Sequence, residues 1–221
     1  MTETNTRGAS HGPAGASKQV KVWDPLIRVF HWGLVAAFAT AYLAAEGWQS
    51  VHEIAGYVVA GLLAFRLLWG LVGGRYARFT QFLKGPRATL DYLGAMKSGT
   101  ERRYIGHNPA GAAMIVALVL TISGTALTGW LMEDTQRLAM LPSMPQVVTP
   151  AYADNDYDEG QYGEGDAGIL GEVHEVLANI AVFLIVLHIA GVVLASVRHK
   201  ENLANAMVTG KKRAPGPDDI A

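Results

Sequence analysis

Four long apolar segments constrain the fold of this chain more than any other feature of its sequence. They cover about residues 25–45, 52–72, 110–131 and 172–197. Each reaches or approaches the roughly 20 residues that a helix needs to cross the hydrocarbon of a bilayer. Because lipid offers the backbone no hydrogen-bonding partners, segments of this kind are expected to be helical. The sequence therefore predicts an all-α integral membrane protein built as a four-helix bundle.

The composition supports a membrane protein and narrows its chemistry. Of the 221 residues, 50% are hydrophobic and only 17% are charged, whereas soluble domains average about 25% charged residues. The chain has no cysteine, which excludes thiolate-bound iron–sulfur clusters, structural disulfides and covalent c-type haem attachment. Histidine remains as the strong nitrogen ligand. We expect no nucleic-acid partner.

The basic residues are unevenly distributed over the loops. Of the 18 lysine and arginine residues, 17 lie before or early in the first segment, at or between the second and third, or after the fourth; the exception is Arg137. Lysine and arginine are enriched in the cytoplasmic loops of membrane proteins. This pattern predicts a multi-pass protein with both termini in the cytoplasm.

This topology divides the chain into three parts. Residues 1–19, rich in Gly, Ser, Thr and Ala, are expected to form a disordered cytoplasmic tail. Residues 20–200 form the transmembrane domain, and residues 201–221 form a cytoplasmic C-terminal tail. The first apolar segment begins too late for a secretory signal, so we interpret it as an uncleaved span. The loop 132–171 lies on the outer side and is acidic; it is either a solvated spacer or a docking surface for a basic electron carrier.

Four histidines lie within or at the ends of the apolar segments: His31, His52, His174 and His188. An imidazole is costly in hydrocarbon and is rarely kept there without a partner or a function. His174 and His188 are fourteen residues apart, which places both on nearly the same helix face, roughly 21 Å apart along the axis. One helix therefore offers a nitrogen ligand near each side of a bilayer about 30 Å thick.

The expected depth of each histidine in the membrane indicates which of them lie at the same level. His31 lies roughly 9 Å inside the first segment from the cytoplasmic side, and His188 roughly 13 Å inside the fourth. His52 and His174 each open their segment on the outer side. We therefore expect one pair, His31 with His188, near the cytoplasm and a second pair, His52 with His174, near the outer surface. Each pair suits one haem iron, because two axial imidazoles leave the iron closed to small ligands and limit it to electron exchange.

Several motifs carry a family resemblance. They are Val22-Trp23-Asp24-Pro25-Leu26-Ile27-Arg28-Val29-Phe30-His31-Trp32, His52-Glu53-Ile54-Ala55-Gly56, Gly106-His107-Asn108-Pro109-Ala110-Gly111, His174-Glu175, His188-Ile189-Ala190-Gly191, and residues 201–212. Over about residues 20–213 the sequence resembles the bacterial cytochrome b561 and nickel-dependent hydrogenase b-type cytochrome family. The sequence differs from the hydrogenase signature at Gly33, which follows Trp32, and at Ala45-Glu46-Gly47.

The resemblance implies a diheme cytochrome b in the bacterial cytoplasmic (inner) membrane. It implies two haem b groups between the helices, bound by the residues that correspond to His31, His52, His174 and His188. We predict an electron-transfer subunit of a respiratory oxidoreductase, with no catalytic residue of its own. It would pass electrons between a periplasmic partner, either a cytochrome c or a hydrogenase-type enzyme, and the quinone pool.

Two other functions remain open at this point. Intramembrane histidines also mark metal-ion and proton transporters, although the spans lack acidic residues away from their ends and show no inverted repeat of broken helices. The second is a redox-silent anchor that recruits a peripheral complex. Haem content distinguishes all three. The remaining histidines, His11, His107 and His199, are interpreted as ordinary polar residues of the tail and the cytoplasmic interface.

Overall fold

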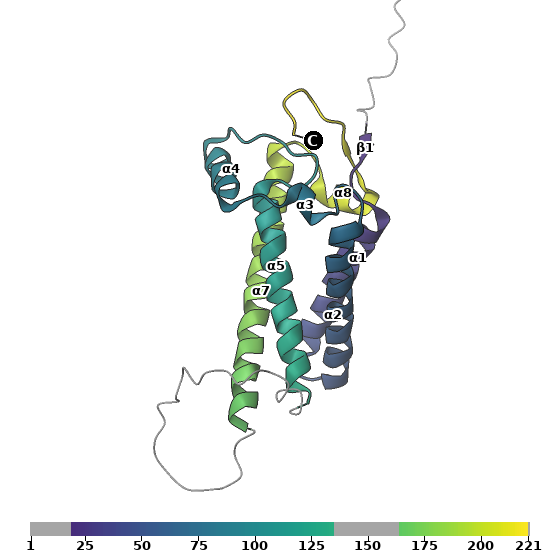
Figure 1. The fold of residues 1–221 in the computed structure, drawn as a ribbon, viewed down its shortest axis with the longest axis vertical. Coiled ribbons are helices and arrows are strands. Elements are labelled where there is room, and N and C mark those ends of the chain that lie inside the picture. Colours follow the sequence, from purple (N-terminus) through teal and green to yellow (C-terminus); the bar gives the residue numbers. More distant parts are fainter. Residues whose placement is uncertain (1–18, 135–163, 221) are drawn as a thin grey trace, which may run out of the picture.

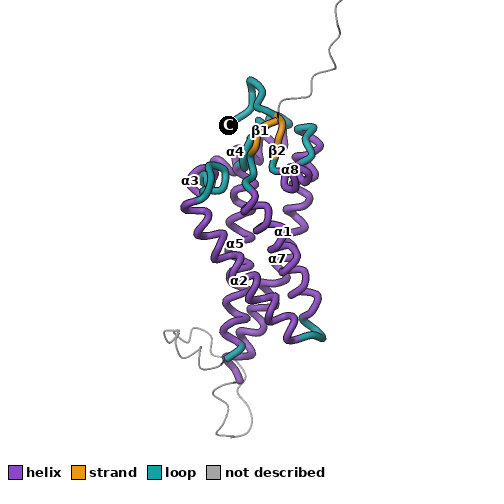
Figure 2. Tube along the Cα trace, turned by 90° about the vertical axis from the view of Figure 1, so that its right-hand side faces the viewer, coloured by secondary structure: helices purple, strands orange, loops and turns teal. Residues whose placement is uncertain are grey.

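The computed structural model describes residues 19–134 and 164–220, and four long helices dominate this part of the chain (Figure 1). They are α1 (Pro25–Ala44), α2 (Gln49–Val72), α5 (Pro109–Met132) and α7 (Glu164–Arg198). Each contains a stretch long and apolar enough to cross a membrane. The helices run side by side as one elongated bundle (Figures 1 and 2). The predicted all-α membrane bundle is confirmed.

Two of the long helices begin at the same kind of cap. The Asp24 side chain accepts a hydrogen bond from the backbone N–H of Ile27 at 2.9 Å, and the Asn108 side chain accepts one from Gly111 at 2.7 Å. Proline follows each capping residue. Because a capping oxygen satisfies a free N–H and proline needs none at the first helical position, these motifs define where α1 and α5 begin.

Helix α7 is longer than the sequence predicts. It begins at Glu164, eight residues before the expected start at 172, so the helix takes in the last part of the segment 132–171 that we expected to be loop. Hydropathy marks only the part of a helix that suits hydrocarbon, and a helix can continue beyond it. The central part of the acidic loop, residues 135–163, and most of the expected N-terminal tail, residues 1–18, lie outside the described residues.

The bundle consists of two helix pairs. Helix α1 packs along α2, and α5 packs along α7, while contact between the pairs is made chiefly by α2 and α5. A buried apolar cluster joins the pairs in the middle of the bundle, formed by Val59, Leu63, Ile122 and Ala181. On the outside, large apolar side chains such as Leu43, Leu71 and Val197 remain exposed along the helices. An apolar surface of this extent suits contact with lipid.

All the shorter elements gather at one end of the bundle, which we call the capped end (Figure 1). They are α3 (Phe79–Phe82), α4 (Pro86–Ser98), α8 (Leu203–Thr209), β1 (Gln19–Lys21) and β2 (Lys211–Arg213). Strands β1 and β2 pair antiparallel, so the segment before α1 is joined to the segment after α8. The C-terminal segment is therefore folded against the bundle.

A buried ion network fastens the C-terminal segment to the loop before α5. The Arg103 guanidinium donates to both carboxylate oxygens of Glu201, at 2.7 and 3.1 Å, and also to Asp219. Lys212 is buried and donates to the carbonyl oxygen of Ile105 at 3.0 Å. Although burial opposes it, these hydrogen bonds and nearby cations hold the pKa of Glu201 below its ordinary value. Hydrogen bonds between ionised groups therefore stabilise the packing of the capped end.

Candidate functional site

At the end opposite the capped end, histidines from α2 and α7 lie next to each other. The ring centroids of His52 and His174 are 6.0 Å apart, and the ring planes are inclined at 69°. Both side chains are half-buried. The two histidines that we expected at one outer level are therefore neighbours, and we call them the outer pair.

Hydrogen bonds from neighbouring helices orient both rings of the outer pair. His52 Nδ1 lies 2.8 Å from the carbonyl oxygen of Ala41 on α1, and His174 Nδ1 lies 2.9 Å from that of Thr125 on α5. The hydroxyl of Thr128 is also within 3.1 Å of His174 Nδ1. A carbonyl oxygen can only accept, so each Nδ1 carries the proton and each Nε2 keeps its lone pair for a ligand.

The two rings of the outer pair are close enough that both would reach one iron ion. An imidazole nitrogen binds a transition metal at about 2 Å, and the two ring centroids are 6.0 Å apart. With Nε2 unprotonated on both rings, the donor set fits a haem iron.

Small residues of α5 leave room for the His174 ring. A Cβ atom added at Gly129 would lie 3.0 Å from His174 Cε1, closer than ordinary van der Waals contact. Glycine at this position therefore lets α5 approach the ring. Gly129, Thr125 and the Ala41 carbonyl were not identified from the sequence. A pair of threonines at the level of a histidine, in an otherwise apolar span, is the signal that could have indicated Thr125 and Thr128.

The other two predicted histidines lie closer to the capped end, and we call them the inner pair. His31 is in the second turn of α1, and His188 lies ten residues before the end of α7 at Arg198. The two side chains are half-buried and near enough for their charges to interact. His31 Nδ1 is shielded from solvent and has no hydrogen-bond partner in the described part of the chain. Unlike the outer pair, His31 is not oriented by a carbonyl group.

Arg66 of α2, which is as far from the capped end of its helix as His31 is in α1, is a buried cation. Its guanidinium lies 4.5 Å from the ring centroid of Phe79 and 5.9 Å from that of Phe82. In the sequence, Arg66 is one of the 17 basic residues on the predicted cytoplasmic side, and no site role is predicted for it. An isolated arginine six residues inside an apolar span is the signal that could have distinguished it.

His107 occupies the same end of the molecule in an aromatic environment. Its ring centroid lies 4.6 Å from those of Trp23 and Phe82. Burial lowers the pKa of His107 to about 3, and the charges of Arg66, Lys212 and His188 act in the same direction. His107 is therefore a neutral, half-buried ring packed against aromatic side chains and not a fully solvated interfacial residue. His199 is half-buried after the end of α7, and His11 lies outside the described residues.

The donor sets differ from those of a site for a free metal ion. In the described ranges, no three His, Asp or Glu side chains cluster closely enough to hold a metal ion. The histidines instead form pairs. A porphyrin would supply the four further nitrogen ligands that an iron needs beside two histidines.

Comparison with known proteins gives one family. The family model described as prokaryotic cytochrome b561 matches residues 22–210. The matched region includes all four long helices and the four histidines of the inner and outer pairs. No curated protein and no solved structure gives a significant match. The family resemblance found in the sequence motifs is confirmed.

Proposed function

The chain belongs to the prokaryotic cytochrome b561 family, and from that premise we propose that it holds two haems, one at the outer pair and one at the inner pair. Family membership makes it a multi-pass bacterial membrane protein that binds haem b and transfers electrons. Bound haem supplies reversible one-electron exchange at its iron. The two pairs of histidines are the observation that carries the proposal of two haems.

The middle of the bundle supports two separate redox positions. Ala181, in the central apolar cluster, lies seven residues from His174 and seven from His188 along α7. Seven helical residues rise by about 10 Å. The buried apolar side chains of this cluster thus lie between the two histidine levels.

We propose that the capped end faces the cytoplasm. The loops and short elements there carry most of the basic residues of the described chain: Lys21, Arg75, Arg78, Lys84, Arg87, Lys97, Arg102, Lys200, Lys211 and Arg213. Positively charged loops remain on the cytoplasmic side of bacterial membranes. This orientation puts the outer pair near the periplasm and the inner pair near the cytoplasm.

We further propose that the protein exchanges electrons with a periplasmic redox protein and with the quinone pool. The end that carries the outer pair is acidic, with Glu46, Glu53, Glu172 and Glu175 around it. Acidic groups near a redox site raise the encounter rate of a basic partner more than they raise its affinity. This favours a basic cytochrome c as the periplasmic partner over a hydrogenase-type subunit.

The test is haem quantitation on the purified full-length protein. We expect two low-spin b haems per chain in the reduced-minus-oxidised spectrum. His174→Ala should remove one haem and spare the other, and His188→Ala should remove the complementary one. His199→Ala, which changes a histidine outside both pairs, is the matched control and should keep both. A wild-type protein without b haem, or a full haem content in both ligand variants, would refute the proposal.

A further inference from the structure

Arg66 is a cation inside one of the apolar helices, six residues before α2 ends at Val72. Only 4% of its surface is exposed, so it faces the interior of the bundle and not lipid. Arginine within a membrane span is expensive and is normally paired with an anion or with backbone carbonyls. Its planar fork of donors matches a carboxylate in particular.

No such partner is found for Arg66 within residues 19–134 and 164–220. Its Nη1 is shielded from solvent without a hydrogen-bond partner, and none of the ion pairs of this region includes it. The charge of Asp24 acts on Arg66, but Asp24 Oδ1 accepts from the Ile27 N–H at 2.9 Å and Oδ2 accepts from Trp69 Nε1 at 3.3 Å. The rings of Phe79 and Phe82 attract the cation but accept no conventional hydrogen bond from it.

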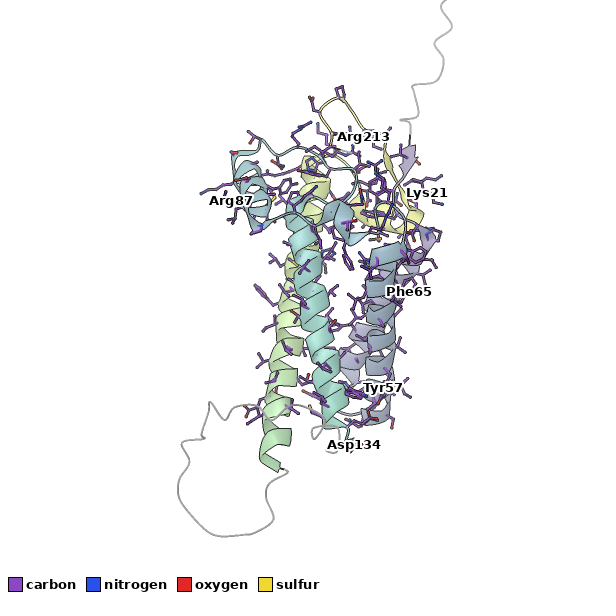
Figure 3. The ribbon with its side chains drawn as sticks, in the orientation of Figure 1. Lys21, Tyr57, Phe65, Arg87, Asp134 and Arg213 are labelled. Atoms are coloured by element: carbon purple, nitrogen blue, oxygen red, sulfur yellow. The ribbon has the colours of Figure 1, made fainter. Side chains whose placement is uncertain are left out.

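Arg66 lies at the level of the inner pair. It is six residues from the capped end of α2, and His31 is six residues from the capped end of α1, so each lies about 9 Å inside its helix. Helices α1 and α2 pack along each other. The charges of Arg66 and His188 both act on His107. The unpaired donor therefore lies at about the same level as the histidines that we propose as ligands. Figure 3 marks the height of this region by Phe65, the preceding residue on α2.

We propose that Arg66 binds a propionate carboxylate of the haem held by His31 and His188. This inference rests on the proposed function. A b haem carries two propionates on one edge, and a carboxylate is the anion that an isolated, buried guanidinium lacks. Arg28 is less suited, because its Nη1 already donates to the carbonyl oxygen of Val208 at 2.5 Å. Arg66 then acts as a positioning residue. It holds the propionate at α2, and its positive charge partly offsets the negative charge of that propionate.

The experiment compares Arg66→Gln and Arg66→Lys in the full-length, haem-loaded protein. The matched control is Arg87→Gln, which changes an exposed arginine on α4, away from the bundle (Figure 3). Haem content and a redox titration resolved into two components are measured for each. Without the positive charge the oxidised haem is favoured, so Arg66→Gln should lower the midpoint potential of one component or lose that haem. The affected component should be the one that His188→Ala removes. Arg66→Lys should retain the haem with a potential nearer to the wild type, and Arg87→Gln should change neither component.

Three results would overturn the assignment. The first is an Arg66→Gln protein with the haem content and both potentials of the wild type. The second is a shift in the component that His174→Ala removes. The third is an equal loss of both haems in Arg66→Gln and Arg66→Lys, which would assign Arg66 to packing and not to charge. Each of these can occur in a protein whose wild type holds two haems, so the inference can fail while the proposed function stands. A wild type with fewer than two haems instead contradicts the proposed function.

Discussion

The outer and inner pairs use the same residue type in different ways. Carbonyl oxygens of α1 and α5 orient both rings of the outer pair, and their Nδ1 atoms are 2.8 and 2.9 Å from those oxygens. The inner region instead contains unpaired groups. All four solvent-shielded side-chain atoms without a partner in the described chain belong to it or to the adjoining capped end: Arg28 Nε, His31 Nδ1, Arg66 Nη1 and His107 Nδ1.

This difference separates a preorganised site from a site that needs its ligand. Buried polar groups are nearly always hydrogen-bonded, so a concentration of exceptions indicates a missing partner. The outer pair is positioned by the protein alone, because its orienting bonds come from the backbone. At the inner pair, Arg66 Nη1 and His31 Nδ1 have no such partner in the described chain, and the propionate that we propose would supply one to Arg66.

The comparison predicts, as its largest effect, unequal losses of stability when each haem is removed. His188→Ala should lower the melting temperature more than His174→Ala, because it leaves Arg66 and His31 unpaired inside the bundle. Each unsatisfied buried group costs about 1–3 kcal/mol. Circular dichroism at 222 nm during heating in detergent measures the difference, with haem content recorded in parallel. Equal melting temperatures would remove the distinction between the two levels.

A smaller effect should follow when the orienting bonds of the outer pair are weakened. Thr128→Val removes the hydroxyl that lies 3.1 Å from His174 Nδ1 but leaves the carbonyl of Thr125 in place. Loss of an outer partner of a ligating histidine typically weakens binding by about 10- to 100-fold, and we expect the lower value here. The rate of haem transfer to an excess of a haem-binding acceptor protein measures it.

Thr125→Val is the matched control for that experiment. The Thr125 hydroxyl donates to the carbonyl oxygen of Thr121 at 3.0 Å, and the Thr125 contact to His174 is made by its backbone. This variant should release the outer haem at nearly the wild-type rate. If both valine variants release it equally fast, the orienting role of Thr128 is wrong.

A subtler change should come from crowding the outer pair without removing any hydrogen bond. Gly129→Ala places a Cβ atom 3.0 Å from His174 Cε1 and should displace the ring by a few tenths of an ångström. Alanine favours a helix by up to about 1 kcal/mol over glycine, so stability should not fall. The electron paramagnetic resonance signal of one haem should shift.

Gly124→Ala provides the comparison for the Gly129 variant, since its Cβ would meet Leu177 Cδ1 at 3.1 Å and no histidine. A flexible leucine can move aside. Unchanged signals in Gly129→Ala, or the same shift in both variants, would show that α5 does not set the ring position.

The smallest expected effect concerns pH and is confined to the capped end. The pKa of Glu201 and that of Asp219 are below their ordinary values of 4.5 and 3.8, because hydrogen bonds and cations outweigh the burial that opposes ionisation. A carboxyl group whose pKa is lowered by folding stabilises the folded state at pH values above its ordinary pKa. This contribution is lost as the pH falls through the lowered pKa.

The capped end should therefore open only in acid, below about pH 4, with no change between pH 6 and 8. Hydrogen exchange of Leu203–Thr209 and Lys211–Arg213, followed as the pH is lowered, tests this. Opening at neutral pH, or simultaneous opening around the outer pair, would contradict it.

Much of the fold could be predicted because it depends on local sequence. The length of the apolar segments predicted four membrane helices, and Asp24-Pro25 and Asn108-Pro109 stand where two of them begin. The spacing of His174 and His188 set their common face through helical geometry alone. Hydropathy was a poorer guide to helix ends, as the early start of α7 at Glu164 shows. It also gave no sign that residues 203–213 would fold onto the bundle.

Sequence alone thus determined the number of spans and the family, because apolar length and short motifs can each be read from consecutive residues. Tertiary structure decided which ring nitrogen is free at the outer pair, since the carbonyls of Ala41 and Thr125 come from other helices. It also decided that Arg66 is buried without a partner. Hydrogen bonding and burial arise from packing between distant segments, and no pattern along one helix contains that information.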